Sequence, residues 1–433
     1  MNKLTVIGGG LAGCEAAYAA ANRGIEVELI EMKPAKRTAA HKSDYLAELV
    51  CSNSLKAARV DSAAGLLKEE MRRLGSVCLA AADKSAVAAG GALAVDRDIF
   101  SRLITEKIKN HPNITVTERL VTEIPQSGVT VIATGPLTDD KLAEKLAGLC
   151  DGGNLSFYDA AAPIVTAESV DMSKAFFASR YDNGGDDYIN CPMNKEEYTA
   201  FYRELISAES APLHGFDKAP NVYEGCMPIE VLAKRGEDSI RFGPLKPVGL
   251  RDPRTGHRPW AAVQLRRENA AATLFNIVGF QTNLKFSEQK RVFSMIPGLE
   301  NAEFMRYGVM HRNTFINSPK MLNRNLSLKA DKNIFIAGQL SGVEGYMESA
   351  ASGIIAGINA AAEITGEKPL VLPETTMTGA LLSYITNPLT ENFQPMGANF
   401  GIIPPLETHI RDKRERYAAL AARALGILAE NIK

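Results

Sequence analysis

The sequence predicts an α/β protein in which a Rossmann-type domain with a parallel sheet is interrupted by a mixed α/β insertion domain. Three segments support this prediction. A strand, a glycine-rich turn and a helix of small residues open the chain at residues 3–24; a strand ending in Thr-Gly follows at residues 129–136; another strand, glycine-rich loop and small-residue helix fill residues 333–366. Strands alternating with helices are typical of parallel sheets. The long stretches between the three segments indicate an insertion.

The first segment, "KLTVIGGGLAGCEAAYAAANRGIEVELIEMKP", contains the clearest binding motif. Residues 4–7 form a predicted buried strand, G-x-G-x-x-G at residues 8–13 opens a helix, and residues 25–30 form a second strand that Glu31 closes. Such glycines let the backbone approach a pyrophosphate at the positive end of a helix, and the acid can accept hydrogen bonds from a ribose. Because these pieces occur in this order, the segment predicts a dinucleotide site rather than a plain glycine turn.

The late return of this pattern indicates which dinucleotide is bound. The segment "NIFIAGQLSGVEGYMESAASGIIAGINAAAEITG" would not be needed by a simple NAD-dependent dehydrogenase. Flavoproteins of the glutathione-reductase type wrap FAD with three pieces that resemble these, so FAD is the expected cofactor, although Gln339 replaces the usual acid of the last piece. The predicted cofactor-binding residues are Gly8, Gly9, Gly10, Leu11, Ala12, Gly13, Glu31, Gly338, Gln339 and Tyr346.

The domain organisation follows from length and from the positions of these segments. A chain of 433 residues exceeds what one hydrophobic core usually organises, so two or three domains are expected. We expect the FAD-binding domain to comprise residues 1–136 and, with C-terminal helices, residues 333–433. Residues 137–332, rich in turns, form the expected insertion and substrate domain. The tail, "RDKRERYAALAARALGILAENIK", has apolar residues at helical spacing and predicts a helix that packs on the protein or faces RNA.

Positive charge is concentrated in one part of the chain. Residues 231–330 hold 17 Lys and Arg against 7 Asp and Glu, whereas the whole chain has a formal net charge of −1. Such an excess is either a solvated face or a footprint for a polyanion. The stretch "KRGEDSIRFGPLKPVGLRDPRTGHRPW" mixes cations with Gly, Pro and the single Trp, which suits a nucleic-acid backbone. Arg251, Arg254 and Arg258 are therefore the predicted RNA contacts.

The six cysteines show no C-x-x-C or Cys/His spacing, so neither a disulfide framework nor a metal site is expected. Reduced thiols fit a cytoplasmic protein. Neither a signal peptide nor a membrane-spanning segment is predicted, because glycines interrupt the first apolar run and no other run is long enough. Cys51 and Cys226 stand out, since both lie among loop-forming residues whereas free cysteines usually lie in cores.

Over nearly its whole length the chain resembles the folate- and flavin-dependent tRNA uracil-5-methyltransferases, the TrmFO family. The resemblance rests on "VIGGGLAGCEAA", "ELVCSNSLK", "VYEGCMPIEV", "RFGPLKPVGL", "MHRNTFINSP", "FIAGQLSGVEGY" and "FQPMGANFG". Several of these strings are long and unusual, which makes chance similarity implausible. The GidA-related proteins that modify the tRNA wobble uridine share the flavin core and a similar "GQ…GY" segment, but they are much longer and lack both cysteine motifs.

The resemblance implies that the protein methylates C5 of the T-loop uridine of tRNA (position 54) without S-adenosylmethionine. Methylenetetrahydrofolate is the implied co-substrate and carbon donor, and FAD reduced by NADPH or NADH supplies the electrons. Cys226 and Cys51 are the implied catalytic thiols. His311 and Tyr346 are implied to stack near the flavin and pterin rings, which makes His311 the expected folate contact.

Chain position suggests how the two thiols divide the work. Cys226 lies in the inserted region that should face RNA, so we expect its thiolate to add to uracil C6 and so activate C5. Cys51 follows the dinucleotide-binding unit, so we expect it near the cofactor, where it assists methylene transfer. Cations such as Lys56, or those of the basic region, would promote thiolate character. The reverse assignment of the two thiols is left open.

Other functions compete with this one. A related flavoenzyme would methylate a uridine in ribosomal RNA by the same chemistry, and a non-catalytic flavin-containing protein would bind tRNA but would need no nucleophile. An NAD-dependent small-molecule dehydrogenase is disfavoured by the basic insertion and by the second flavin segment. The choice between NADH and NADPH and the oligomeric state are left open, and no obligatory protein partner is inferred.

Overall fold

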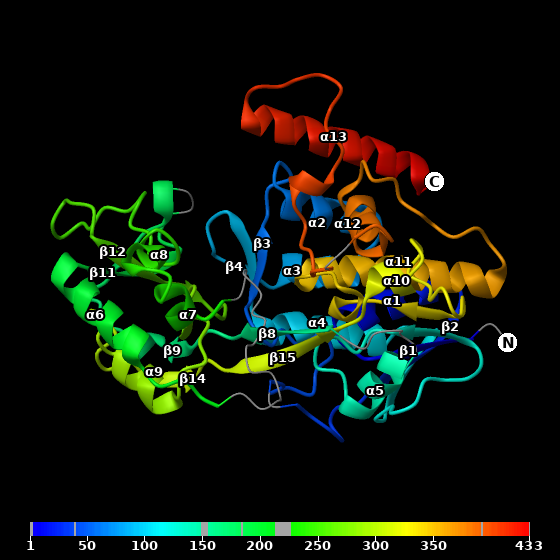
Figure 1. Ribbon diagram of the computed structural model, residues 1–433, viewed down its shortest axis with the longest axis horizontal. Coiled ribbons are helices and arrows are strands. Elements are labelled where there is room, and N and C mark those ends of the chain that lie inside the picture. The colour runs from blue at the N-terminus through cyan, green and yellow to red at the C-terminus, as the bar shows by residue number, and fades with distance from the viewer. Residues whose placement is uncertain are drawn as a thin grey trace.

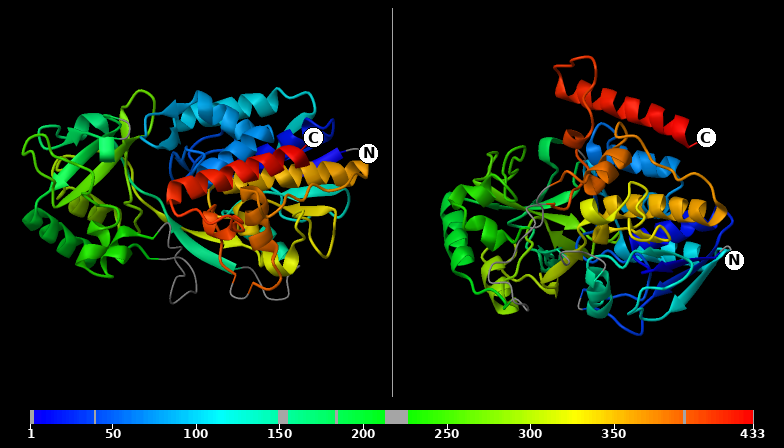
Figure 2. Two further views of the ribbon diagram at one scale, coloured as in Figure 1. Left: turned by 90° about the horizontal axis from the view of Figure 1, so that it is seen from above. Right: turned by 45° about the vertical axis from the view of Figure 1, so that its right-hand side comes forward.

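The computed structural model describes residues 3–38, 40–148, 155–182, 185–212, 227–390 and 393–432. Figure 1 shows two bodies side by side. The smaller body, drawn in green at the left, carries the chain from strand β9 (Ile164–Thr166) to strand β14 (Phe304–Arg306), and the larger body carries both ends of the described chain. The two views of Figure 2 show the same separation.

The larger body is built on a five-stranded parallel sheet in the order β16-β7-β1-β2-β6. The first strand, β1, lies at the centre and pairs with β2 on one side and β7 on the other. β16, from the late segment, pairs with β7. The three segments that the sequence singled out therefore meet in one sheet. The strands are β1 (Lys3–Ile7), β2 (Glu26–Glu31), β6 (Ile114–Glu118), β7 (Val129–Ile132) and β16 (Ile334–Ile336).

Two helices of small residues pack against each other beside this sheet. Helix α1 (Leu11–Ala21) and helix α11 (Tyr346–Thr365) meet at glycines of α11. A Cβ atom on Gly353 would lie 2.2 Å from the carbonyl oxygen of Ala12, and one on Gly357 would meet the next turn of α1 at 2.3 Å. Because no side chain fits at these two positions, the backbones of the first and last glycine segments pack directly together.

Further helices surround the sheet and complete the core of the larger body. The long C-terminal helix α13 (Lys413–Asn431) lies across the top in Figure 1 and buries one apolar stripe, as the spacing of the tail predicted. The other helices of this body are α2 (Ala63–Arg73), α3 (Val77–Lys84), α4 (Arg97–Lys109), α5 (Asp140–Gly148), α10 (Ser318–Met321) and α12 (Met377–Thr386).

The smaller body has its own core and an antiparallel sheet in the order β10-β11-β12-β13-β9-β14. Its core contains the buried rings of Phe201, Phe280 and Phe293, which contact one another. Its other elements are β10 (Phe176–Phe177), β11 (Tyr188–Met193), β12 (Ala261–Arg267), β13 (Leu274–Ile277), α6 (Lys195–Ser207), α7 (Ile229–Ala233), α8 (Glu237–Arg241) and α9 (Phe286–Phe293).

Two small sheets lie where the bodies meet. Strands β8 (Leu155–Ala160) and β15 (Met310–Phe315) form an antiparallel pair that runs between the bodies in Figure 1. Strands β3 (Ser54–Ala57), β5 (Ala92–Val95) and β4 (Ala86–Val87) form a three-stranded sheet in the order β3-β5-β4. The residues that join the bodies therefore come from four separate parts of the chain.

The structure confirms the predicted fold class, a parallel-sheet α/β domain with a mixed α/β insertion. The exact boundaries at residues 136 and 332 stay a prediction; Leu142 and several residues between Phe315 and Leu328 pack in the core of the larger body. Across the described part of the chain, no helix is both long and apolar enough to cross a membrane.

Candidate functional site

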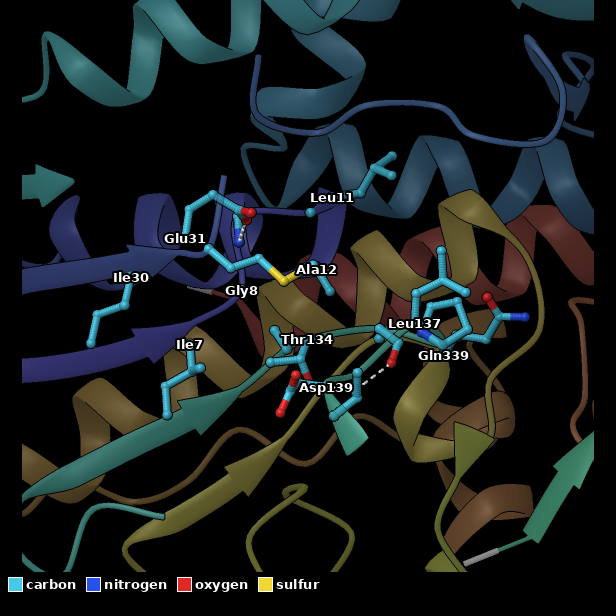
Figure 3. Close-up of a pocket in the computed structure, with 18 of the residues that line it drawn as sticks. Ile7, Gly8, Leu11, Ala12, Ile30, Glu31, Thr134, Leu137, Asp139 and Gln339 are labelled. Atoms are coloured by element: carbon cyan, nitrogen blue, oxygen red, sulfur yellow. Dashed lines mark hydrogen bonds between the residues drawn. The ribbon is translucent and has the colours of Figure 1, made fainter. Parts of the chain in front are cut away.

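A pocket opens at the carboxyl ends of the parallel strands, where ligands bind in open α/β sheets. Figure 3 shows Glu31 and Gln339 on opposite sides of this pocket, with Gly8, Ala12 and Thr134 between them. The predicted cofactor-binding residues that line it are Gly8, Gly9, Gly10, Leu11, Ala12, Glu31, Gly338, Gln339 and Tyr346. Residues from the beginning, the middle and the late part of the chain thus form one pocket.

The three glycines of the first motif serve different purposes. Gly8 has a φ of +102°, and a Cβ on Gly13 would lie 1.8 Å from the Gly8 carbonyl oxygen, so both positions are closed to other residues by the turn itself. A Cβ on Gly10 would meet no atom within 4 Å. Gly10 is also the N-cap residue of α1. Because it has no side chain to accept a hydrogen bond from the first turn, the first N–H groups of the helix face open space. This is the cradle that a pyrophosphate needs.

Glu31 ends β2 beside this cradle and is almost fully buried. Its two carboxylate oxygens accept hydrogen bonds from backbone N–H groups, Oε2 from Gly9 at 2.6 Å and Oε1 from Lys33 at 3.0 Å. These bonds fix the carboxylate in the pocket wall. Each oxygen has a second lone pair, so the carboxylate is able to accept from the hydroxyls of a ribose.

Gln339 occupies the position at which flavoproteins of this type usually have an acid. Its side-chain amide donates to Glu344 Oε2 at 2.6 Å, and Glu344 is buried. A carboxylate is therefore present behind the glutamine, five positions further along the chain. One N–H of the amide is used by Glu344, which leaves its second N–H and the Gln339 carbonyl to face a ligand.

Tyr346 connects the pocket to Cys51. Its ring lines the pocket, and its hydroxyl oxygen accepts hydrogen bonds from the backbone N–H of Cys51 at 2.7 Å and of Ser52 at 3.2 Å. The Cys51 thiol donates to the carbonyl oxygen of Ala160 on β8 at 3.7 Å. Burial raises the pKa of Tyr346 well above its ordinary value, so the phenol is neutral at all physiological pH values. The prediction that Cys51 lies near the cofactor pocket agrees with this geometry.

Three arginines hold the backbone around Cys51, and we call them the arginine clamp: Arg97, Arg266 and Arg306. Arg97 donates to the carbonyl oxygens of Leu49 and Cys51, and Arg306 donates to that of Val50. Three consecutive carbonyl groups are therefore fixed by guanidinium groups. Since Arg97 begins α4 whereas Arg306 ends β14, the clamp also ties the two bodies together.

Arg266 of β12 completes the clamp from the smaller body. Its guanidinium donates to Asn53 Oδ1 at 3.0 Å and to Ser52 Oγ at 2.8 Å. Asn53 is fully buried, and its amide donates in turn to the carbonyl oxygens of Val95 and Arg267. Every residue from position 49 to 53 thus has a backbone or side-chain bond to the clamp.

The clamp carries more positive charge than its surroundings neutralise. Glu268 is the carboxylate that pairs with Arg97, and it is 5% exposed. Burial raises the pKa of Glu268 despite the three neighbouring arginines, and burial lowers the pKa of Arg266 and of Arg306. Three guanidinium groups against one carboxylate make the vicinity of Cys51 electropositive.

Lys56, the cation that the sequence suggested for this purpose, is used differently. Its ammonium group pairs with Glu348 at 2.6 Å, and Glu348 is buried. The clamp arginines, which sequence reasoning missed, supply the positive charge instead. Charged residues within an otherwise apolar strand, such as Arg266 in "AAVQLRR", were the available signal.

The predicted RNA contacts Arg251, Arg254 and Arg258 are exposed on the smaller body. Arg254 forms a bidentate ion pair with Asp252 at 2.7 and 3.0 Å, whereas Arg258 makes no side-chain hydrogen bond or ion pair with any described residue. Arg254 and Arg258 line a cavity of about 710 Å³ together with Trp260. Their role as RNA contacts stays a prediction.

The cavity beside Trp260 has further cations. The guanidinium of Arg241 lies 3.7 Å from the centre of the Trp260 ring, and the ammonium of Lys195 lies 5.4 Å from it. Both distances are typical of cation–π contacts. The tryptophan thereby orders two cations at the edge of this cavity.

Two predicted site residues cannot be placed in full. Cys226 lies outside the described residues; the described part of its motif begins at Met227, and Pro228 is the N-cap of α7. The backbone of His311 lies in β15 opposite Asp159, one position from the pair formed by Met310 and Ala160. That register brings the His311 backbone close to the carbonyl group that Cys51 contacts.

The pocket contains residues that the motifs did not indicate. Asp139 lies seven positions after the end of β7, and Arg119 directly follows β6. Arg119 could have been found from its position, because it comes directly after a parallel strand. Thr134, which also lines the pocket, belongs to the Thr-Gly pair that the sequence singled out. No group of three or more His, Cys, Asp or Glu side chains in the described part of the chain is arranged to hold a metal ion.

Comparisons with known proteins identify the relatives of this chain. The family model "Glucose inhibited division protein A" matches residues 3–368. The Methylenetetrahydrofolate--tRNA-(uracil-5-)-methyltransferase TrmFO of Lactobacillus gasseri is 57% identical over 98% of this chain and 97% of its own length. The proteins of the same name from Acetivibrio thermocellus and Enterococcus faecalis are 58% and 56% identical, over 99% and 100% of this chain and 98% and 99% of their own lengths.

Among solved structures, GidA of Aquifex aeolicus is similar with a TM-score of 0.70 and 18% identity, covering 99% of this chain and 73% of that chain. At that identity the likeness concerns the fold alone. The curated relatives settle the family, because more than half of all aligned positions are identical over essentially the whole chain. The pocket, the Cys51 geometry and these identities together lead to one conclusion: the chain belongs to the TrmFO family.

Proposed function

We propose that this protein methylates C5 of a uridine in tRNA, the T-loop uridine at position 54, with methylenetetrahydrofolate as the carbon donor. The observation that carries the proposal is the link between the nucleotide pocket and a thiol: Tyr346 lines the pocket and binds the backbone of Cys51. A dinucleotide and a nucleophile so arranged suit a redox-coupled transfer of a carbon group. The names of the close relatives support tRNA over ribosomal RNA as the substrate.

The pocket fits FAD. The open space at Gly10 and the N-terminus of α1 suit the pyrophosphate, the carboxylate of Glu31 suits a ribose, and the late segment at Gly338 and Gln339 suits the distal half of the cofactor. When bound, FAD reduced by NADPH or NADH supplies the hydride equivalent that brings the carbon from the methylene to the methyl level. The phenol of Tyr346 separates this pocket from the Cys51 backbone.

The protein itself supplies nucleophiles and their environment. Uracil C5 is a poor nucleophile until a thiolate adds to C6, and we assign this addition to Cys226. Cys51, held beside the pocket, assists transfer of the methylene carbon. The arginine clamp supports this role, because it fixes the chain on both sides of Cys51 and places positive charge beside it.

The first experiment measures the product directly. The purified protein, incubated with unmodified tRNA, methylenetetrahydrofolate and NADPH or NADH, should give 5-methyluridine by nucleoside mass spectrometry, and ribosomal RNA fragments should give none. Cys51→Ala should retain flavin absorbance yet lose the product. Gly10→Val should lose the flavin itself, since the valine side chain fills the pyrophosphate cradle. A wild-type protein that binds no FAD and forms no 5-methyluridine would refute the proposal.

The second experiment tests the division of labour between the thiols. In RNA with 5-fluorouridine at the target, C5 carries fluorine in place of the hydrogen that normally leaves as a proton, so the C6 adduct should persist once C5 has taken the methylene carbon. Wild type should give a protein–RNA species stable to denaturation, whereas Cys226→Ala should not. Peptide mapping that finds the RNA on Cys51 would reverse the assignment.

A further inference from the structure

The guanidinium of Arg180, where the two bodies meet, has no hydrogen-bonded or ion-paired partner among the described residues. Its Nε and one Nη nitrogen are inaccessible to solvent and make no hydrogen bond. Burial lowers the pKa of Arg180, and the groups that act against this effect are the phenols of Tyr181 and Tyr188 rather than carboxylates. An unpaired guanidinium with buried donor atoms is costly. We therefore expect the guanidinium of Arg180 to pair with an anion that is not part of the protein.

Arg180 lines a cavity of about 560 Å³, which we call the Arg180 cavity. One wall comes from β11 and β12 of the smaller body, with Tyr188 and Gln264, and the opposite wall comes from β3 and from the loop at residues 89–92 between β4 and β5. In Figure 1, β3 and β4 lie at the junction of the two bodies. The cavity therefore belongs to neither body alone.

A second polar group in this cavity also lacks a partner. Ser179 is 4% exposed, and its hydroxyl oxygen makes no hydrogen bond with any described residue. Ser179 and Arg180 are adjacent in the chain and both line the cavity. A buried hydroxyl donor next to a guanidinium is a typical arrangement for binding an oxyanion.

Cations continue from the cavity along the surface. Arg59, at the end of β3, lines the same cavity and pairs with Asp61 at 2.9 Å. Asp61 also pairs with Arg414 at the start of α13, at 3.3 Å. One carboxylate is thus shared by two exposed guanidinium groups. A row of cations suits a polymeric ligand with successive negative charges. A ligand with a single carboxylate would need only Arg180.

We propose that the Arg180 cavity binds a backbone phosphate of the RNA substrate, with Arg59 and Arg414 contacting neighbouring phosphates. This proposal rests on the proposed function and identifies a place where its RNA is held. It is separate from the surface arginines near Trp260, which lie in a different cavity.

The position of the cavity explains how phosphate binding serves the reaction. Gln264 lines the cavity, and Arg266 of the clamp lies two residues further along the same strand, β12. Residues two apart in a strand lie on the same face and about 7 Å apart. Tyr188 of the cavity is paired with Arg266 across the sheet. A phosphate in the cavity is therefore bound beside the strand whose Arg266 holds the side chains of Ser52 and Asn53, next to Cys51.

Two variants test the proposal with the full-length protein and a tRNA transcript. Arg180→Met removes the charge. Gly91→Asp adds a carboxylate, since Gly91 lines the cavity and a Cβ there would meet no atom within 4 Å. Arg72→Gln is the matched control, because Arg72 pairs with Asp83 on another face. Binding is measured by fluorescence anisotropy at several salt concentrations, and unfolding by a thermal scan.

Both cavity variants should weaken tRNA binding about tenfold at low salt. Arg180→Met should also reduce the slope of log affinity against log salt by roughly one phosphate contact. The midpoint of thermal unfolding of Arg180→Met should be unchanged or higher, because an unpaired buried charge has been removed. Arg72→Gln should leave RNA binding unchanged.

Several outcomes would overturn the proposal. A lower unfolding midpoint for Arg180→Met with unchanged RNA binding would make Arg180 a structural residue. An increased KM for methylenetetrahydrofolate with unchanged RNA binding would instead indicate the carboxylate tail of the folate as the anion. The proposed function fails separately: it is refuted if the wild-type protein forms no 5-methyluridine, whatever the variants do to RNA affinity.

Discussion

The clamp arginines of the smaller body and the surface arginines (Arg251, Arg254 and Arg258) come from the same basic stretch of the chain, yet they lie in opposite environments. Arg266 is 7% exposed and binds the Cys51 backbone region, while Arg258 projects into solvent without a protein partner in the described part of the structure. The clamp arginines bind groups of the protein itself, whereas the surface arginines are available to bind a polyanion. A count of charges over a sequence window adds the two together, so it overstates the surface charge.

The largest effect should come from breaking the ion pair between Arg97 of the clamp and Glu268. Arg97→Met leaves Glu268 buried without its partner, which should lower the free energy of unfolding by about 3–5 kcal/mol. Chemical denaturation measures this loss. The double variant Arg97→Met/Glu268→Met should recover most of it, since no charge is then left unpaired. A double variant as unstable as the single one would show that Arg97 acts through the carbonyl groups alone.

A smaller effect should follow from Arg266→Met, which leaves the buried Asn53 oxygen without its donor. We expect a loss of about 2 kcal/mol in the free energy of unfolding and a drop in methylation of at least about 100-fold with flavin content retained. Arg266→Lys keeps the charge but cannot reach both acceptors, so it should recover stability more than activity. Equal activity in Arg266→Met and wild type would contradict the positioning role.

The surface arginines should behave in the opposite way. Arg251→Gln/Arg258→Gln should weaken tRNA binding and flatten its salt dependence, with a change in the free energy of unfolding within about 0.5 kcal/mol. Arg254→Gln should weaken binding less, because its charge is already paired with Asp252. If the affinity and salt slope of the double variant equal those of wild type, these residues form an ordinary solvated face.

The smallest expected effect is on the pH dependence of stability, which should have opposite signs at Glu268 and at Asp252. Burial raises the pKa of Glu268, so its contribution to stability is present at acid pH and is lost as the pH rises from the ordinary carboxyl range through the raised pKa. The hydrogen bond from Arg254 lowers the pKa of Asp252, so that contribution is present at neutral pH and is lost as the pH falls through the lowered pKa.

Replacing each of the two carboxylates with its amide measures this difference. Glu268→Gln should remove a decline in stability on the alkaline side of the carboxyl range, and Asp252→Asn should remove a decline on its acid side. Denaturation at a series of pH values gives both curves. Two declines on the same side would mean that the two carboxylates have similar environments.

The sequence predicted the parallel sheet and its pocket well because both depend on local patterns. The motif from Gly8 to Gly13 and the acid at Glu31 are constraints of a turn, a helix start and a strand end, which are visible in a short window. The late segment could be assigned to the same domain because it repeats the pattern of the first. No partner far along the chain had to be known for these predictions.

The environment of Cys51 could not be predicted in the same way. Its arginines come from α4, β12 and β14, and the phenol that binds its backbone comes from α11. No spacing relates these positions, because their proximity results from how the two bodies pack. The same holds for Arg180 and Gln264 in their cavity. Sequence patterns revealed which residues could react, whereas the tertiary structure was needed to see what surrounds them.

The pairing of β16 with β7 has a consequence for how the chain is made. β7 ends at Ile132, and its neighbour β16 begins at Ile334. At translation rates of roughly 5–20 residues per second, β7 leaves the ribosome on the order of 10–40 seconds before the strand that covers its edge. During that interval the nascent sheet has an open edge and α1 lacks α11. The smaller body is synthesised in the same interval, so it is complete before the cofactor pocket can close.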